Sequence, residues 1–543
     1  MEGVHVKLFH QGSGRGGRDG ELGCPSSATV PAGDFPLRNP RIPSSPITCD
    51  LEIGSPAMAS LHDATNGHCE PRHEAGCNGD ARASGAGNGG SDCARPSKRL
   101  RPSPIIPEEI RCEFAHHDPA VARLNNGSFG SCPASVLAAQ QRLQRLWLRQ
   151  PDAFYFDDLQ PSLLRSRQVI RSLINADHAE EVSLVDNATT AAAIVFQRVQ
   201  RAFQEGVYDK GDAIVMLHYA YGAVKKSAQA YVARAGATVV EVPLPFPVRS
   251  EEEVVAEFRK ALGVAKEGGR RKVRMAVIDH ISSMPSVVIP VKRLTRICRE
   301  EGVEEVFVDA AHALGNVEID VKDIGADFYT SNLHKWFFCP PSVAFLYCRK
   351  SSASSDVHHP VVSSEYGKGL AIESGWIGTR DYSAQLVVPE ILDFVNRFEG
   401  GIDGILKRNH EKVVEMGEML VKAWGTCLGS PPKMSCSMIM VGLPGCLGIT
   451  SDKDAQKLRR HLREEFQVEV PIYYNVQKEG EDALLDSTAR ITGYVRISHQ
   501  IYNVVDDYYR LRDVVNKFVK DGFSCQMLPS NSCEAVSGQH VVA

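Results

Sequence analysis

The stretch Ser331-Asn332-Leu333-His334-Lys335-Trp336 places a lysine just after a short apolar run that begins at Asp327. Earlier in the chain, Val306-Phe307-Val308-Asp309 is another apolar run, and it ends in a carboxylate. Short β-branched and aromatic runs are typical of strands buried in a parallel sheet, and binding sites form at the carboxyl ends of such strands. A third run, at residues 343–348, follows soon after. The pattern predicts three strands with polar groups at two consecutive connections, which indicates a site.

A lysine and a carboxylate in these positions are the two groups that hold pyridoxal 5′-phosphate (PLP). The lysine forms a Schiff base with the cofactor, and the carboxylate pairs with the pyridinium nitrogen. Because an ionised partner raises the basicity of the nitrogen it faces, Asp309 would keep the ring protonated and make it an electron sink. The alternative for Lys335 is a surface or structural lysine, since most lysines are solvated. We predict PLP as the cofactor and Lys335 and Asp309 as catalytic residues.

Length and composition are those of an ordinary globular protein. The 543 residues suffice for two or three domains, and 43% hydrophobic with 23% charged residues is typical of soluble chains. Charges interrupt the apolar runs before about 18 residues, so we expect no transmembrane helix and no membrane partner. The net charge of −5 gives no basic excess, which speaks against a nucleic-acid partner.

The 15 cysteines follow no repeating spacing, which favours free thiols in a reducing compartment over a disulfide framework. Cys69, His73, Cys77 and Cys93 form a loose group, but their spacings match no standard zinc finger. We therefore predict no metal site.

The first part of the chain differs in composition from the rest. Gly, Ser, Pro, Arg and Asn predominate there, and such a segment cannot bury enough apolar area to offset chain entropy. Its acidic residues argue against a transit peptide, although a plastid or mitochondrial address stays open. The basic cluster at residues 95–101 is either a nuclear-import signal or a solvated linker, and Met58 offers an internal start. We expect an intracellular protein, in the nucleus or cytosol or in one of those organelles.

From residue 105 onward, apolar runs alternate with helical patterns, which predicts a mostly parallel α/β sheet with right-handed crossovers. After about residue 390 the pattern becomes that of a separate α+β arrangement. We predict a disordered N-terminal tail at 1–104, a large domain at 105–390, a small α+β domain at 391–525 and a flexible C-terminal tail at 526–543. The expected strands are 213–217, 237–242, 273–279, 438–441, 468–473 and 494–498, and the expected helices are 133–149, 393–424, 452–466 and 504–519.

From about Glu113 to Lys520 the chain resembles the class V, fold type I family of PLP-dependent enzymes, which includes cysteine desulfurases, isopenicillin-N-epimerase-like proteins and selenocysteine lyases. Within that family it resembles the plant L-cysteine desulfhydrase branch. The motifs that carry the resemblance occur in the same order, namely Phe114–His117, Leu124–Gly130, Val185–Ala192 and Ser331–Phe338.

The resemblance implies roles for the cofactor's phosphate and ring. Asn187, Ala188 and Thr189 match the turn that holds the phosphate, and a helix N-terminus suits a dianion; an ordinary helix residue is the alternative for Thr189. Tyr219 matches the position whose ring stacks on the pyridine, where many relatives have histidine, although a core tyrosine is also open.

Further roles follow from the same resemblance. His312 matches the residue that bonds the ring's phenolic oxygen and is expected to be catalytic, with a core or capping histidine as the alternative. Asn332 and His334 match phosphate contacts. Thr379, in Gly378-Thr379-Arg380-Asp381, matches a loop that reaches the neighbouring subunit's phosphate in family dimers, so a homodimer is expected.

Arg496 matches the arginine that grips the substrate's α-carboxylate, for which a planar guanidinium is well suited. A surface arginine at a strand end is the alternative. The roles of His358, His359 and Tyr366 stay open.

The implied activity is α,β-elimination of L-cysteine to hydrogen sulfide, pyruvate and ammonia. A desulfurase needs a cysteine thiolate on a mobile loop, and no cysteine lies between Cys348 and Cys427, where relatives carry it. A desulfurase or selenocysteine lyase-like enzyme, an amino-acid epimerase on the same fold, and a catalytically silent binding protein remain as alternatives.

Overall fold

A seven-stranded sheet forms the centre of the computed structural model, which describes residues 104–350, 356–475 and 491–529. The strand order is β2-β8-β7-β6-β5-β3-β4. Strands β4, β3, β5, β6 and β7 pair in parallel, whereas β8 pairs antiparallel with both β7 and β2. The strands are β2 Val182–Val185, β3 Ala213–Leu217, β4 Thr238–Val242, β5 Val273–Asp279, β6 Glu305–Asp309, β7 Phe328–Asn332 and β8 Ala344–Cys348. The predicted mostly parallel sheet is confirmed.

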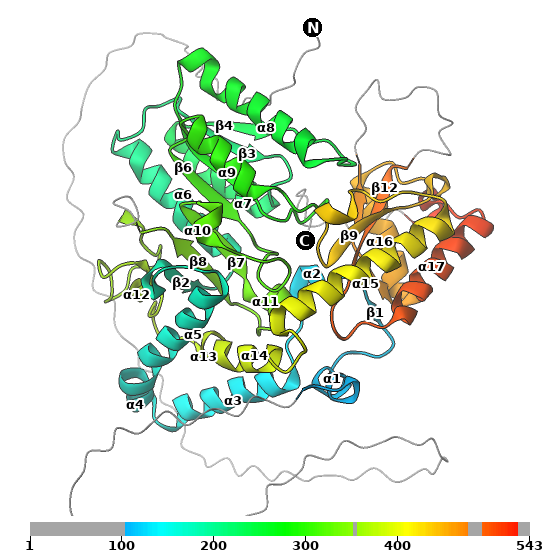
Figure 1. Cartoon of the computed structure of the whole chain (residues 1–543), viewed down its shortest axis with the longest axis horizontal. Coiled ribbons are helices and arrows are strands. Elements are labelled where there is room, and N and C mark those ends of the chain that lie inside the picture. Colours follow the sequence, from blue (N-terminus) through cyan, green and yellow to red (C-terminus); the bar gives the residue numbers. More distant parts are fainter. Residues whose placement is uncertain (1–103, 351–355, 476–490, 530–543) are drawn as a thin grey trace, which may run out of the picture. The chain divides into compact units, whose positions relative to one another are not determined.

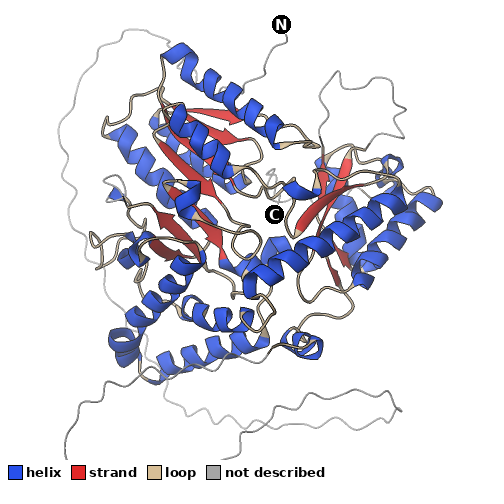
Figure 2. Cartoon of the chain, viewed as in Figure 1, coloured by secondary structure: helices blue, strands red, loops and turns tan. Residues whose placement is uncertain are grey.

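Helices cover both faces of this sheet (Figure 1, Figure 2). Alternate residues of one strand enter different cores: Ile214 and Met216 pack with helix α6 (Ala188–Gln204), while Val215 packs on the opposite face with α8 (Glu251–Lys266). A sheet buried on both faces needs apolar side chains at consecutive positions. This requirement explains the continuous apolar runs of the sequence.

The other helices at this sheet include α3 (Ala134–Arg149), α5 (Gln160–Leu173), α7 (Gly222–Ser227), α9 (Val291–Glu300) and α14 (Val388–Val395). Short helix α10 (Val321–Ile324) connects β6 with β7, and α11 (Leu333–Trp336) connects β7 with β8. Two further short helices, α12 (Leu370–Glu373) and α13 (Ser383–Leu386), follow β8.

A second, antiparallel sheet has the order β11-β12-β9. It consists of β9 (Met438–Gly442), β11 (Ile472–Tyr474) and β12 (Gly493–Ser498), and it packs with α15 (Gly401–Trp424), α16 (Asp452–Phe466) and α17 (Val505–Lys520). The N-terminal strand β1 (Ala122–Arg123) pairs with β10 (Val468–Glu469). The segment before the large sheet therefore lies against the C-terminal part of the chain.

Two predicted elements are wrong. The single helix expected at 393–424 is two helices, α14 and α15, because Gly400 and Gly401 between them have φ of 75° and 58°, outside the right-handed helical region. The strand expected at 468–473 is divided into β10 and β11 at Pro471, whose nitrogen cannot donate to a ladder.

The domain boundaries stay a prediction. Helix α14 crosses the boundary drawn at residues 390 and 391, and its Ile391 and Phe394 belong to a core that also includes residues of the large sheet. The predicted N-terminal tail, the basic cluster at 95–101, Met58 and the cysteine group at 69–93 lie outside the described residues, as do residues 530–543 of the C-terminal tail. Among the helices that the structure describes, none is long and apolar enough to span a membrane.

Candidate active site

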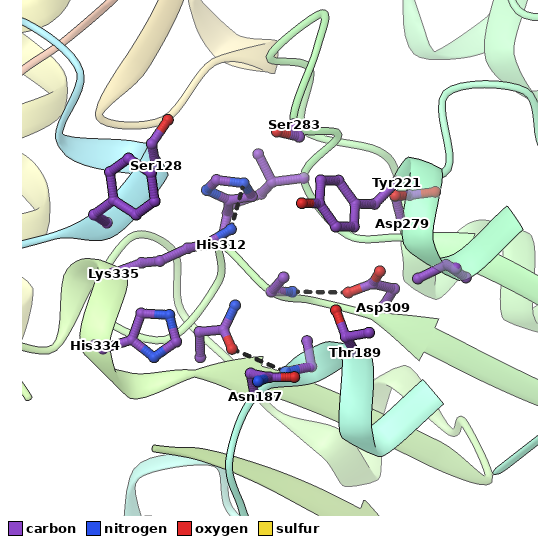
Figure 3. Close-up of a pocket in the computed structure, with 16 residues that line it drawn as sticks. Ser128, Asn187, Thr189, Tyr221, Asp279, Ser283, Asp309, His312, His334 and Lys335 are labelled. Atoms are coloured by element: carbon purple, nitrogen blue, oxygen red, sulfur yellow. Dashed lines mark hydrogen bonds between the residues drawn. The ribbon is translucent and has the colours of Figure 1, made fainter. Parts of the chain in front are cut away.

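A cavity of about 200 Å³ lies at the carboxyl ends of β5, β6 and β7, beside the N-terminus of α6 (Figure 3). It brings together residues from widely separated motifs. The predicted site residues that line it are Lys335, Asp309, His312, Asn187, Ala188, Thr189, Asn332 and His334. Tyr219, Thr379 and Arg496 are not among its lining residues.

Lys335 stands on the short helix α11, which follows β7 directly. Its Nζ lies 3.1 Å from Nε2 of His312. Burial, together with the positive charge of Arg496, lowers the pKa of Lys335 to about 8, while Asp309 opposes that shift. A substantial share of this amine is therefore neutral near physiological pH, as a nucleophile or base must be.

Asp309 ends strand β6 and is almost fully buried. One of its carboxylate oxygens accepts the backbone N–H of Ala311 at 3.1 Å. Burial raises the pKa of Asp309, while that hydrogen bond and the charge of Lys335 act in the opposite direction.

A second buried acid, Asp279, ends strand β5 in register with Asp309 and also lines the cavity. Burial and the neighbouring Asp309 raise the pKa of Asp279 well above its usual value, and its Oδ2 has no hydrogen-bond partner among the residues that the structure describes. Two close carboxyl groups in a buried site cannot both ionise easily. We assign the proton to Asp279 and the negative charge to Asp309.

The opposite end of the cavity is built by the first turn of α6. Asn187 caps this 17-residue helix, because its Oδ1 accepts the backbone N–H of Thr190 at 2.9 Å. The backbone N–H of Ala188 donates to Oδ1 of Asn332, also at 2.9 Å (Figure 3). A helix N-terminus with polar side chains around it fits a phosphate dianion.

His334 lies at the same end (Figure 3). Its Nδ1 lies 3.2 Å from the backbone oxygen of Val343, which can only accept, so Nδ1 carries a proton. Burial and the adjacent Lys335 lower the pKa of His334 to about 4. In the neutral ring Nε2 is therefore an acceptor, and a proton must be taken up before this atom can donate to a phosphate.

Tyr219 is not among the residues that line the cavity, and its stacking role stays a prediction. Its hydroxyl donates to the carbonyl of Pro245 at 2.6 Å, and its ring belongs to the core. Tyr221, two residues later, lines the cavity instead (Figure 3). The motif His218–Gly222 contained both rings, and sequence alone gave no way to choose between them.

Arg496, on β12, is fully buried just behind the cavity. Its guanidinium donates to Oδ1 of Asn125 at 2.8 Å, to the backbone oxygen of Ser283 at 2.8 Å, and to Oγ of Ser128 at 3.1 Å. Ser128 and Ser283 both line the cavity, so they separate the arginine from it. Within the described part of the chain, its Nε has no hydrogen-bond partner.

Thr379 lies in a loop whose next residue, Arg380, contacts the segment just before helix α6. Arg380 forms an ion pair with Asp186, the residue before Asn187. His359 is near the same pair, since both charges affect its pKa, which burial lowers.

Several residues that line the cavity were not predicted from the sequence. Asp279 had a usable signal, because it ends an apolar run in the same way as Asp309 does. Ser128 and Phe129 lie within the motif Leu124–Gly130, which the sequence analysis singled out without assigning roles to these two residues, whereas Ser283 had no signal in the sequence.

These residues fit PLP. A partly buried lysine, a buried anion and a helix N-terminus surround one cavity, and they match the cofactor's aldehyde, ring nitrogen and phosphate in chemical type. Asp279 adds a buried oxygen that has no hydrogen-bond partner in the described ranges, which leaves a polar atom for a bound molecule.

Known proteins resemble the chain in sequence and in fold. Residues 159–425 match the model of the family Aminotransferase class-V. "Putative L-cysteine desulfhydrase 1" of Oryza sativa subsp. japonica is 65% identical over 445 residues, which cover 81% of this chain and 92% of that protein. "Probable L-cysteine desulfhydrase, chloroplastic" of Arabidopsis thaliana is 64% identical over 440 residues, covering 81% and 91%. The apo cysteine desulfurase of Thermococcus onnurineus NA1 shares the fold with a TM-score of 0.56 and 19% identity, covering 77% of this chain and 99% of that one.

Fold and site together define a fold type I, PLP-dependent enzyme of class V. The chain belongs to this family, and within it to the group of plant proteins that carry the name L-cysteine desulfhydrase. The predictions of the family and of PLP as cofactor are confirmed.

Proposed function

We propose that the protein is a PLP-dependent carbon–sulfur lyase that converts L-cysteine and one water into hydrogen sulfide, pyruvate and ammonia. The observation that carries this proposal is the cavity in which Lys335 and Asp309 stand together, without a cysteine among its lining residues. The high identity to plant proteins named L-cysteine desulfhydrase supports the same substrate.

The reaction removes a proton from Cα and sulfide from Cβ of the substrate. When bound, PLP supplies an electron sink for the electron pair that the Cα–H bond leaves behind. The neutral amine of Lys335 receives the Cα proton on Nζ, and the carboxylate of Asp309 holds a positive charge on the ring nitrogen. The Cβ–S bond then breaks with its electron pair on sulfur, and water replaces the nitrogen in the released product.

Arg496 is proposed to hold the substrate's α-carboxylate, directly or through the hydroxyls of Ser128 and Ser283. Its guanidinium already donates to both serines, and both line the cavity. A carboxylate that approaches these hydroxyls would meet donors polarised by a buried cation.

A desulfurase mechanism is disfavoured by the state of the thiols. Burial raises the pKa of Cys348 to about 12 and that of Cys436 to about 11, and the buried Cys298 has a pKa of about 12. A persulfide-forming nucleophile needs the opposite shift, toward the thiolate. Within the described ranges, the remaining exposed cysteines, Cys112, Cys427 and Cys446, do not line the cavity.

Product analysis tests the proposal. Full-length protein loaded with PLP is incubated with L-cysteine, and sulfide, pyruvate, alanine and D-cysteine are quantified. We expect sulfide and pyruvate in equal amounts, and none from Lys335→Ala. Stoichiometric alanine with protein-bound sulfur would establish a desulfurase instead, and D-cysteine would establish an epimerase. Absence of cofactor absorbance from the wild-type protein would favour a silent binding protein.

We also propose that the protein acts as a homodimer in which Thr379 approaches the phosphate of the PLP molecule bound by the partner subunit. Phe129 supports a covering partner, because it lines the cavity and yet is 72% exposed in the single chain. Light scattering should give twice the chain mass. Mixing inactive Thr379→Ala with inactive Lys335→Ala should restore part of the activity, since a hybrid dimer would contain one complete site; no restoration would contradict the shared site.

We propose two candidate locations for the protein. The first is the nucleus or the cytosol, and the second is the plastid. The basic cluster at residues 95–101 supports the first, and the name "chloroplastic" of the Arabidopsis thaliana relative supports the second. A fluorescent fusion to the C-terminus of the full chain distinguishes them.

A further inference from the structure

His312 is held between two consecutive residues of helix α11. The indole N–H of Trp336 donates to Nδ1 of His312 at 3.3 Å, and Nζ of Lys335 lies 3.1 Å from Nε2 of the same ring (Figure 3 shows the second contact). His312 is 2% exposed and Trp336 is 1% exposed. Both ring nitrogens of the histidine are therefore in contact with a defined partner.

The chemistry of the indole fixes where the proton of His312 lies. An indole N–H can donate but cannot accept, so Nδ1 of His312 must be the accepting nitrogen. Burial and nearby positive charges lower the pKa of His312 well below its usual value, so the ring is neutral. A neutral ring whose Nδ1 accepts carries its proton on Nε2, the atom that faces Lys335.

The tautomer of His312 affects the protonation state of Lys335. An ammonium has no lone pair, so an Nε2–H that points at Nζ can form a hydrogen bond only with the neutral amine. The opposite tautomer would present a lone pair and would stabilise the ammonium. The tautomer that Trp336 selects therefore favours the form of Lys335 that can attack an aldehyde.

We propose that Trp336 is a positioning residue that fixes the Nε2–H tautomer of His312 and thereby shifts the equilibrium of Lys335 toward the neutral amine that binds the cofactor. The inference rests on the assignment of Lys335 as the PLP lysine but not on the identity of the amino-acid substrate.

The packing around both rings supports a fixed orientation. A Cβ added at Gly127 would lie 3.2 Å from Cζ2 of Trp336 and 3.5 Å from Cε1 of His312, so the backbone of this segment lies directly against the two rings. A Cβ at Gly315, where φ is 83°, would lie only 2.4 Å from the backbone oxygen of Trp336. The backbone at Gly127 thus lies close to both rings, and the backbone at Gly315 lies close to the backbone of Trp336.

The test measures cofactor uptake, not turnover. Full-length protein freed of PLP is mixed with PLP between pH 6 and pH 10, and the growth of the bound cofactor's visible absorbance gives the rate of capture by Lys335. In the wild type the rate should rise with a midpoint near the Lys335 pKa of about 8. In Trp336→Phe, which keeps an aromatic ring but has no N–H, the midpoint should move up by about half a unit to one unit, and capture at pH 7 should slow by about fivefold.

Trp424→Phe is the matched control. Its indole N–H also donates a hydrogen bond, to the carbonyl of Arg512 at 3.5 Å, but Trp424 belongs to the core of the second sheet. This variant should keep the wild-type midpoint. An unchanged midpoint in Trp336→Phe, or an equal shift in Trp424→Phe, would overturn the proposal.

A double variant separates tautomer control from simple packing. In His312→Gln, an amide NH₂ can donate to Lys335 without any choice of tautomer. Trp336→Phe should then cause no further shift of the midpoint in the His312→Gln background; the same shift in both backgrounds would show that the indole acts by packing alone. If Trp336→Phe does not fold, His312→Gln should keep the midpoint while His312→Leu raises it, and equal midpoints would refute the role of Nε2–H.

These readouts are independent of the proposed reaction. Protein that captures PLP with the expected midpoints but releases no sulfide from L-cysteine would contradict the proposed function and leave this inference standing. If the wild-type protein releases sulfide and Trp336→Phe has an unshifted midpoint, the proposed function stands and this inference is contradicted.

Discussion

The carboxyl edge of the large sheet and the end of strand β12 both supply charged groups to the same site, but they present them differently. Asp309 and Lys335, at the ends of β6 and β7, line the cavity. Arg496, on β12, is fully buried, and its guanidinium donates hydrogen bonds to Asn125, Ser128 and Ser283. The cofactor side of the site is open, whereas the carboxylate side is closed by the protein's own polar groups.

This difference indicates how the work is divided. Parallel strands end at one edge, so the large sheet brings Asp309 and Lys335 to the same side of the site. Arg496 depends on the contact between the N-terminal segment, β12 and the loop after β5. Arg496 is fully buried, and burial lowers its pKa to about 10. We expect substitutions on the open side, at Asp309 or Lys335, to lower activity toward any amino-acid substrate. Substitutions on the closed side, at Arg496, should change which substrates are accepted.

Loss of the open-side lysine should have the largest effect. Lys335→Ala should reduce sulfide release from L-cysteine by about a thousandfold or more, because the covalent anchor and the base are removed together. Lys322→Ala, at an exposed helix position, is the control and should keep full activity. If Lys335→Ala kept more than a tenth of the wild-type activity, Lys335 could not be the covalent anchor and base of the open side.

The closed side is tested by Arg496→Lys. The ammonium cannot replace a guanidinium that donates to three side chains, so kcat/KM for L-cysteine should fall by about a hundredfold while cofactor absorbance persists. Cysteamine, which lacks the carboxylate, is the diagnostic compound: its binding, measured by the change in cofactor absorbance, should be almost the same in the two proteins. An equal loss for both compounds would mean that Arg496 serves only the structure.

The two buried acids sharpen the comparison within the open side. Asp309→Asn removes the negative charge from the ring nitrogen's partner and should lower kcat by about a hundredfold. Asp279→Asn should change kcat by less than about threefold, because an amide resembles the protonated carboxyl that we assign there. Steady-state kinetics at pH 7.5 would show this; a larger loss in Asp279→Asn than in Asp309→Asn would exchange the two assignments.

The smallest effect concerns stability of the cofactor-free protein. The folded-state pKa of Lys335, about 8, lies below its usual value of 10.5, so between these pH values the unfolded chain binds more protons and stability should rise with pH. Below pH 8 the buried ammonium costs stability, and Lys335→Met should be more stable than wild type by about 1–3 kcal/mol at pH 7. Urea unfolding at pH 7 and pH 10 measures this; a gap that does not narrow at pH 10 would contradict the assigned pKa.

The sequence was informative wherever a strand is buried on both faces. The runs at 213–217 and 273–279 match β3 and β5, because such strands require apolar residues at each position. It was misleading at residues 393–424, where the helical pattern continues across two glycines whose positive φ divides the segment. Local periodicity reports which residues are apolar, and it is insensitive to a short break between two helices of similar pattern.

In the site, Lys335 and Asp309 could be predicted because strand ends at one edge of a parallel sheet must meet. Tyr221 could not be separated from Tyr219, since strand alternation ends at Leu217 and the following turn decides which ring faces the cavity. The closed position of Arg496 also had no local signal, because its partners Asn125, Ser128 and Ser283 are remote in sequence.

The family, the cofactor, the large sheet and the two charged groups at its edge could be read from short runs of neighbouring residues in the sequence. Three relations could be seen only in the folded chain: Asp279 stands beside Asp309, Trp336 donates to His312, and Arg496 is enclosed by three polar residues. These relations depend on register between strands and on contacts between distant segments. Such contacts are set by packing of the whole fold, and no single stretch of chain contains them.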